Sequence, residues 1–415
     1  MSRVQAGVAV IDVTPAVGTW MSGFVARTGP STGAHDPITV RAVCVDDTAI
    51  VAVDVVGLHE DFCAAVARGT SLPSANVRVH ATHTHGSPAS VVDRLGGNAD
   101  PAWLESLEQA CVAAVEEARR TSRPARVLAG YAAEVDVAHN RRRTDGPVDR
   151  SVPVVHLVDE AGDPIAIVVS YACHPVVLGA DNTLLTADYP GVVRRVVEAQ
   201  YAGAVALFLT GCAGDANTGH AASASVSLQS GANRTFADAE AAGTELADAV
   251  IAAELHPVDG NVTAAVAEVT LTIDVDPQFS DAAAEWRAVA ADPEADTATT
   301  ALMQCWVEWA DKFASIEPST WQARVGLLRW GGVRIVTLPG EPFTQTGLDL
   351  RATFDRDPGI TIVAGYTDGC PGYLPTTCEY HYGGYEVAEA HRYYGLPGPF
   401  AAGSAERLAE AVTEL

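Results

Sequence analysis

Residues 77–88, VRVHATHTHGSP, change from alternating valines to histidines and then to a turn. Successive side chains of a β-strand point to opposite faces, so the valines are predicted to share one face with His83 and His85. The histidines then lie at the carboxyl end of the strand, where open α/β sheets bind their ligands. Because imidazole is the commonest metal ligand among side chains, the stretch indicates a metal or catalytic site. Two chance histidines at an exposed strand end are the alternative interpretation.

Apolar segments on both sides of this stretch alternate with segments of helical periodicity. Strands are predicted at residues 4–13, 38–46, 49–56, 126–135, 152–158, 165–171, 204–210, 262–275, 324–330, 333–338 and 360–366. A helix is predicted to start at Pro101, and further helices to cover about 190–201, 234–254 and 279–313. This alternation, together with hairpins, predicts an α/β fold with a mixed β-sheet core flanked by helices.

The chain of 415 residues is longer than the roughly 250–300 residues at which single cores stop growing. We find no linker, repeat or low-complexity run in the sequence that would divide it, so one domain over residues 1–415 is predicted. A helical insertion is expected at about 279–320, and it carries Trp286, Trp306 and Trp309. These tryptophans are compatible with core packing and with a lid over an apolar substrate.

Aspartate and glutamate outnumber lysine and arginine by 52 to 26, which gives a formal net charge of −26. This charge argues against nucleic acid and anionic membranes as partners, and it leaves a small-molecule substrate and a homo-oligomer open. The first residues lack the long apolar core of a signal peptide, and no apolar run reaches the roughly 20 residues of a membrane span. A cytoplasmic protein without membrane insertion is therefore expected.

Five further segments place polar or reactive residues at the end of an apolar run. They are AHNRRRTDG (138–146), IVVSYACHPVVLG (167–179), ALFLTGCAGDANTGH (206–220), VTLPGEPFT (336–344) and YTDGCPGYLPTTCEYHYGGYEV (366–387). Each has an ordinary structural interpretation, such as a solvated loop, a tight turn or a packed aromatic loop. Separately, none of the five defines a function.

In chain order, HATHTHG, HNR, CHP, GCAGD, LPGE and GYLPTTCEYHYGGYE resemble the catalytic domain of the neutral (non-lysosomal) ceramidases, which are zinc amidases. The resemblance covers nearly the whole chain and includes GAHDPITVRAVCVDD at residues 33–47. It implies the fold of that catalytic domain, a Zn²⁺ cofactor and hydrolysis of an amide (N-acyl) bond. The carboxyl-terminal immunoglobulin-like domain of the larger members is expected to be absent.

The resemblance also implies roles for individual residues. Two histidines, a carboxylate and a tyrosine match the zinc ligands of the family, namely His83, His174, Glu341 and Tyr373. His85 matches a histidine that transfers protons or orients the substrate, and Arg141 matches an active-site arginine. Tyr385 lies at the offset of a tyrosine that stabilises the oxyanion. Two imidazoles, a carboxylate and a phenolate form a suitable four-ligand zinc site.

The sequence departs from the family at the position of the serine nucleophile, where the turn GDAN carries Asn217. An amide side chain cannot form an acyl-enzyme, so we predict that metal-activated water attacks the substrate. His85 would serve as general base and acid, and Asp215 would orient it or the water. Asn217 would position the substrate or serve as another oxyanion donor. Arg142 replaces the serine of the family's NRS motif, and Cys378 stands within its TTPEEY motif. These departures, together with the absent export signal, favour a soluble substrate over a bilayer lipid.

Three alternatives remain open. Cys173 or Cys212 could act as a nucleophile, although the eight cysteines are scattered without CxxC spacing and most are predicted to be buried. The same zinc site could instead hydrolyse an ester or a lactone, or transfer an acyl group. A non-catalytic zinc-dependent binding protein is the third alternative, which the missing serine permits.

Overall fold

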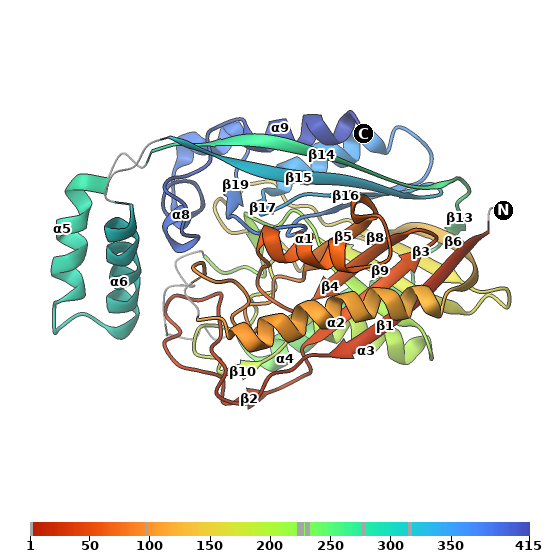
Figure 1. The fold of residues 1–415 in the computed structure, drawn as a ribbon, viewed down its shortest axis with the longest axis horizontal. Helices are drawn as coiled ribbons and strands as arrows, with labels where there is room; N and C mark the ends of the chain where they lie inside the picture. Colours follow the sequence, from red (N-terminus) through yellow and green to blue (C-terminus); the bar gives the residue numbers. More distant parts are fainter. Residues whose placement is uncertain (1–2, 96–97, 222–227, 229–232, 276–278, 314–317) are drawn as a thin grey trace.

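A computed structural model of the chain describes residues 3–95, 98–221, 228, 233–275, 279–313 and 318–415. Its helices and strands stack in four layers, with helices outside two central β-sheets (Figure 1). The mixed α/β class predicted from the sequence is confirmed. The strand pattern did not predict that the strands would form two stacked sheets.

The larger sheet is mixed. It comprises β1 (Val4–Asp12), β3 (Thr39–Val45), β4 (Thr48–Val53), β5 (Val77–Ala81), β6 (Arg123–Ala132), β8 (Val152–Val158), β9 (Pro164–Tyr171), β11 (Val205–Thr210) and β13 (His256–Pro257). The strand order is β11-β9-β8-β6-β1-β3-β4-β5, and β13 pairs with β6. β4 and β5 run parallel, as do β9 and β11. Strands such as β4 and β8 are buried along their whole length, which is typical of a sheet covered on both faces.

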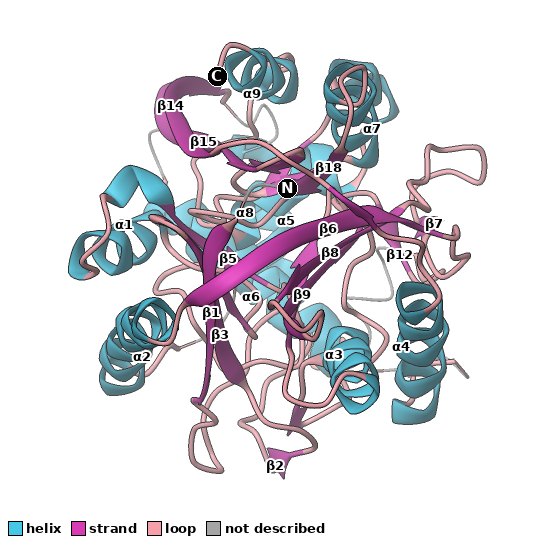
Figure 2. Cartoon of the chain, turned by 90° about the vertical axis from the view of Figure 1, so that its right-hand side faces the viewer, coloured by secondary structure: helices cyan, strands magenta, loops and turns pink. Residues whose placement is uncertain are grey.

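Four helices cover the outer face of this sheet (Figure 2). They are α1 (Glu60–Gly69), α2 (Pro101–Arg120), α3 (Asp188–Gln200) and α4 (Phe236–Ile251). As predicted, α2 begins with Pro101, and the side chain of Asp100 accepts a 2.9 Å hydrogen bond from the N–H of Ala102. The sequence analysis missed α1.

The smaller sheet has the strand order β14-β15-β16-β18. Its strands are β14 (Val262–Ile273), β15 (Ser319–Trp330), β16 (Val333–Thr337) and β18 (Ile360–Ala364), and α7 (Thr344–Phe354) and α9 (Ser404–Thr413) pack on its outer face. Its inner face packs on the larger sheet through a shared apolar core that includes Ile50, Leu328 and Ile335. Trp330 is fully buried there, and its Nε1 donates to the hydroxyl of Thr48 at 2.9 Å.

The ends of three strands from the two sheets meet at one place. The N–H of Ala81, at the end of β5, donates to the carbonyl of Tyr366, which follows β18. Thr210, at the end of β11, accepts from the N–H of Gly365 at 3.1 Å and donates through its hydroxyl to the carbonyl of Thr82. The loops that follow these strands are therefore held together.

A pair of helices, α5 (Phe279–Ala290) and α6 (Thr297–Lys312), lies at the same end of the molecule as the short α8 (Ala390–Tyr393), against which α6 packs (Figure 1). The guanidinium of Arg392 lies over the rings of Trp286, Trp306 and Trp309, at 4.7, 5.4 and 5.6 Å from their centres. The three tryptophans therefore join the helix pair to α8.

No helix within the described ranges combines the length and the apolar character that crossing a membrane would need. The eight cysteines are free thiols, and most of them are buried, as predicted. Cys378 is exposed and Cys305 is partly exposed.

Candidate active site

His83 and His85 lie beyond the strand β5 and not on its face. β5 ends at Ala81, and His83 has a φ of 66°, in the left-handed region that non-glycine residues rarely adopt. The N–H of His83 donates to the carbonyl of Val55 at 2.9 Å, which holds the loop in this conformation. The prediction that the strand extends to His85 is therefore wrong. The two rings nevertheless come together, with their Nε2 atoms 3.2 Å apart.

Backbone carbonyls set the orientation of two histidines. Nδ1 of His83 is hydrogen bonded to the carbonyl of Val56, and Nδ1 of His174 to the carbonyl of Ala213. Because each carbonyl can only accept, the proton of each neutral ring resides on Nδ1 and the lone pair on Nε2. Metal-ligating histidines are oriented in this way in proteins.

Glu341 brings a buried carboxylate to these two lone pairs. Its Oε2 lies 3.2 Å from Nε2 of His83 and 2.7 Å from Nε2 of His174. Burial opposes the charge on Glu341, but the neighbouring histidines hold the pKa of this carboxyl well below its usual range. Burial, and next the charge of Arg141, lower the pKa of His174 to about 4. The carboxylate of Glu341 thus faces the Nε2 atoms of two rings whose Nδ1 atoms are held by backbone carbonyls.

This convergence of acceptors fits a divalent cation. Among the described residues, two groups offer ligand atoms that all lie within 4.8 Å of one another: His83 with His85 and His174, and His83 with Glu341 and Cys370. Imidazole nitrogen and carboxylate oxygen are donors that zinc accepts. The donor set therefore fits the zinc ion that the sequence motifs imply. The sequence analysis did not single out Cys370.

Two tyrosines stand beside the carboxylate. The short β17 (Glu341–Pro342) pairs in parallel with β19 (Tyr373–Leu374), so Tyr373 lies next to Glu341. The hydroxyl of Tyr373 accepts a 2.9 Å hydrogen bond from Nη2 of Arg141. Tyr394, just after α8, donates its hydroxyl to Oε1 of Glu341. This contact, which the sequence analysis missed, leaves Oε2 directed at the histidines.

Replacing Tyr394 with phenylalanine is expected to weaken zinc binding by about 10–100-fold, as loss of a hydrogen bond to a metal-ligating group typically does. Competition with a fluorescent chelator measures the affinity. Tyr393→Phe is the matched control, because the hydroxyl of Tyr393 donates to the carbonyl of Leu95 and not to Glu341. Equal zinc affinity of Tyr394→Phe and Tyr393→Phe would contradict this role of Tyr394.

His85 differs from the other two histidines in its hydrogen bonds. Within the described part of the chain, its buried Nδ1 has no hydrogen-bond partner. Its ring packs 4.9 Å from that of Phe24, and a Cβ on Gly23 would lie 2.9 Å from it, so the glycine-rich loop needs glycine there. Burial, and then the charges of His83 and His174, lower the pKa of His85 well below its ordinary value. The neutral ring retains a nitrogen that can accept a proton.

Arg141 connects the carboxylate region to a π-helical turn at Tyr385–Glu389. Its Nε lies 2.8 Å from Oε1 of Glu386, and its Nη2 donates to the hydroxyl of Tyr373. Burial opposes the charge of Arg141, but Tyr373 and then Glu386 raise its pKa well above the usual value. Tyr385 lies with its ring 6.0 Å from that of Tyr373.

A cavity of about 500 Å³ adjoins this arginine. Its lining comprises Arg141, Arg142, Arg143, Leu302, Trp306, Tyr382, Gly383, Gly384, Tyr385, Glu386 and Glu389. Leu302 and Trp306 belong to α6, so this helix contributes apolar side chains to the lining. The lining also includes Arg141 and Tyr385, which the sequence motifs match to active-site residues. A small molecule in this cavity would lie against both residues.

No family model and no curated protein matches the sequence. Among solved structures, the fold matches neutral ceramidase from Pseudomonas aeruginosa with a TM-score of 0.71 and 18% identity, over 94% of this chain and 72% of that chain. It matches a structure of ceramidase complexed with C2 with a TM-score of 0.70 and 17% identity, over 98% of this chain and 73% of that chain. The chain has a neutral-ceramidase-like fold.

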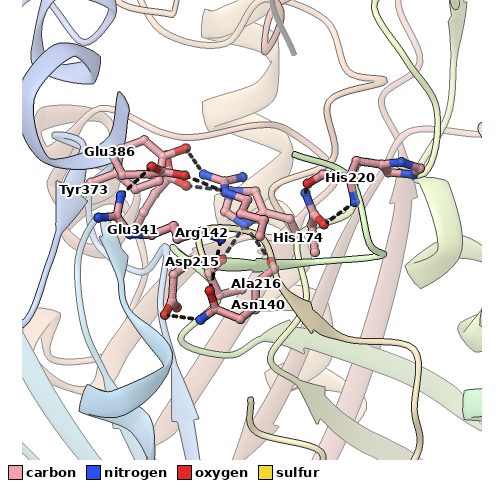
Figure 3. A network of polar contacts seen from close by, with 12 residues as sticks. Asn140, Arg142, His174, Asp215, Ala216, His220, Glu341, Tyr373 and Glu386 are labelled. Atoms are coloured by element: carbon pink, nitrogen blue, oxygen red, sulfur yellow. Dashed lines mark hydrogen bonds and ion pairs between the residues drawn. The ribbon is translucent and has the colours of Figure 1, made fainter. Parts of the chain in front are cut away.

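This neutral-ceramidase-like fold gives Asp215 a supporting position. Its Oδ1 accepts hydrogen bonds from the N–H and the hydroxyl of Thr344, both at 2.7 Å, and its Oδ2 accepts from Asn140 at 3.0 Å (Figure 3). Its carbonyl accepts from the N–H of Arg141 at 2.8 Å. Asp215 therefore anchors the loop of Arg141 and the start of α7 to each other. These contacts differ from the predicted one, in which Asp215 orients His85 or the water.

Asn217 closes a turn in the same fold. Its side-chain oxygen accepts from the N–H groups of Gly219 and His220, each at 2.9 Å, and its amide nitrogen donates to the carbonyl of His220 at 2.7 Å. The side-chain oxygen and one of the two N–H donors of Asn217 are thus used by local backbone. The role of Asn217 toward a substrate stays a prediction, and the second N–H of its amide is the donor that such a role would use.

The two cysteines considered as nucleophiles are buried. Burial raises the pKa of the thiols of both Cys173 and Cys212 above the ordinary value. Because the thiolate is the nucleophilic form, these surroundings disfavour cysteine catalysis.

Proposed function

We propose that the chain is a zinc-dependent hydrolase that cleaves an amide (N-acyl) bond of a soluble small molecule. The observation that carries the proposal is the convergence of Nε2 of His83 and Nε2 of His174 on Oε2 of Glu341, at 3.2 and 2.7 Å. A divalent cation held between these three atoms would bind an imidazole nitrogen from each histidine and a carboxylate oxygen, which are donors that zinc accepts. The likeness to solved structures described as ceramidases supports amide hydrolysis as the reaction class.

His83, His174, Glu341 and Tyr373 are the residues that would hold the zinc ion. When bound, zinc polarises the carbonyl of the substrate and lowers the pKa of water. His85, whose Nε2 lies 3.2 Å from that of His83, takes the proton from the attacking water and later gives it to the leaving nitrogen.

Arg141 and Tyr385 stabilise the oxyanion that forms on the substrate carbonyl. Both line the cavity, and the guanidinium is held by Glu386 before any substrate binds. Donors fixed in advance at a developing charge give the largest catalytic effect, because they need no reorganisation during the reaction. Asp215 supports this pair by anchoring the backbone of Arg141.

We also propose that residues 1–415 form one catalytic domain in which α5 and α6 are an insertion that covers the cavity. Hydrolysis of an ester or a lactone uses the same groups, and it remains the second candidate. A cytoplasmic location stays a prediction from the sequence.

The test is turnover of short N-acyl amides, esters, lactones and ceramide by metal-free and zinc-reconstituted protein. We expect zinc-dependent hydrolysis of a short amide, with ceramide a poorer substrate. Rapid acid quench and intact-mass analysis should detect no acyl adduct, because Asn217 offers no nucleophilic oxygen. An adduct on any side chain would exclude direct attack by water. Zinc binding without turnover of any of these compounds would support the non-catalytic binding protein.

Trp306→Ala is expected to raise KM for the best small substrate roughly tenfold and to leave kcat nearly unchanged. Tenfold corresponds to about 1.4 kcal/mol, less than the ~1.5–3 kcal/mol of a fully buried large apolar side chain. Steady-state kinetics measure both constants. Trp103→Ala, on α2 and outside the cavity lining, is the control. An unchanged KM in Trp306→Ala would show that the substrate does not bind in this cavity.

A further inference from the structure

Arg142 makes contacts that the proposed mechanism does not use. Its Nη1 lies 2.7 Å from Oε2 of Glu386, and its Nε lies 3.2 Å from Oε2 of Glu379 (Figure 3). Its Nη2 donates to the carbonyl of Gly383 at 2.7 Å, and the guanidinium lies over the ring of Phe343, 5.2 Å from its centre. One side chain thus holds the 3₁₀ turn, the glycine turn and the π-helical turn of residues 377–389 against the loop of Arg141.

Glu386 links Arg142 to the site. Its two oxygens are divided between the arginines, with Oε1 2.8 Å from Nε of Arg141 and Oε2 2.7 Å from Nη1 of Arg142. Arg141 then donates to the hydroxyl of Tyr373 at 2.9 Å. The side chains of Arg141, Arg142 and Glu386 are only 4%, 6% and 2% exposed. Charge-assisted hydrogen bonds in such a buried network are strong and depend on one another.

The turn before Tyr385 is shaped around the guanidinium. Gly383 and Gly384 have φ values of 57° and 88°, which side-chain-bearing residues rarely adopt. A Cβ on Gly384 would lie 3.3 Å from Nη1 of Arg142. Glycine at this position therefore lets the turn approach Arg142 closely. The position of the turn also fixes the positions of Tyr385 and Glu386, which follow it in the chain.

We propose that Arg142 is a positioning residue that acts through Glu386. It fixes both the orientation of the Arg141 guanidinium and the place of Tyr385, so that the oxyanion-binding pair is assembled before substrate arrives. Lysine cannot replace it, since a single ammonium cannot reach Glu386, Glu379 and the carbonyl of Gly383 with the geometry of a planar fork. The inference rests on the proposed function for the role of the oxyanion pair.

The kinetic test is Arg142→Lys. We expect kcat to fall roughly 10²-fold, the effect of displacing a catalytic group by about 1 Å, while zinc content stays unchanged. Arg195→Lys is the matched control, because Arg195 is 60% exposed and pairs with Glu240 on the surface. A kcat of Arg142→Lys equal to that of the wild type, or a loss of kcat accompanied by loss of zinc, would overturn the proposal.

A second readout needs no substrate and separates the positioning role from the proposed function. The Nε–H of Arg141, assigned in ¹⁵N NMR spectra by its disappearance in Arg141→Lys, is expected to exchange slowly with water in the wild type. In Arg142→Lys it should exchange at least tenfold faster, and Glu386→Gln should give the same change if the lysine variant does not fold. Unchanged exchange in the folded variant would refute positioning through Glu386, even if no substrate is turned over.

Discussion

His174→Ala is expected to weaken zinc binding roughly 10²–10³-fold and to reduce turnover to background. Zinc bound by four protein ligands is held by ~10–16 kcal/mol, so loss of one ligand removes about 2.5–4 kcal/mol. His83→Ala should behave in the same way, because both Nε2 atoms face Oε2 of Glu341. Elemental analysis and chelator competition on purified and zinc-reconstituted protein measure the change.

His256→Ala is the control for these variants, since His256 is an exposed residue of β13 far along the chain from the site. It should keep wild-type zinc content, about one ion per chain. Absence of any bound transition metal from wild-type protein, both as purified and after zinc reconstitution, would exclude the metal centre. Manganese or iron in place of zinc would keep the site and change only the ion, because nitrogen and oxygen donors do not select zinc by affinity alone.

His85→Ala is expected to keep its zinc and to lose about 10²–10⁴-fold in kcat, the usual contribution of a general acid-base group. The distinction from His83 follows from the hydrogen bonds: Nδ1 of His83 is held by a backbone carbonyl, whereas Nδ1 of His85 has no partner in the described structure. Zinc content and kcat are measured on the same preparations.

The opposite pattern, with zinc lost from His85→Ala and kept by His83→Ala, would reverse the two assignments. Zinc retention in the two variants distinguishes the two histidines, although their Nε2 atoms lie only 3.2 Å apart. A variant that keeps both zinc and turnover would remove His85 from the mechanism.

Periodicity predicted most strands of both sheets, since alternating or continuous apolar runs need only local sequence to be recognised. The same signal cannot assign a strand to a sheet. β14 and β15 alternate as any half-buried strand does, and their separation from the larger sheet depends on how Trp330 and its neighbours pack. The end of β5 was misplaced because His83 adopts a left-handed conformation that residue type does not predict.

The sequence predicts a site residue when that residue lies in a short segment that is recognisable without the fold. Glu341 between glycine and proline is an example, and the fold brings it to His174 across 167 positions of the chain. Tyr394 could not be recognised, because it is one of 11 tyrosines and reaches Glu341 only through the packing of α8. Asp215 was recognised by its turn, yet its contacts with Thr344 and Asn140 depend on tertiary structure.

The proposed ligand atoms come from both sheets of the stacked core. His83 and His174 follow strands of the larger sheet, whereas Glu341 follows β16 of the smaller one. A cation bound by all three residues would link the two sheets, which otherwise pack on each other through apolar side chains. Binding to the native state alone stabilises a protein by RT ln(1 + [L]/Kd), about 2.7 kcal/mol when the free ion is at 100 times Kd. If the proposed metal site is correct, the stability of the fold and the proposed hydrolysis would both depend on the concentration of free metal.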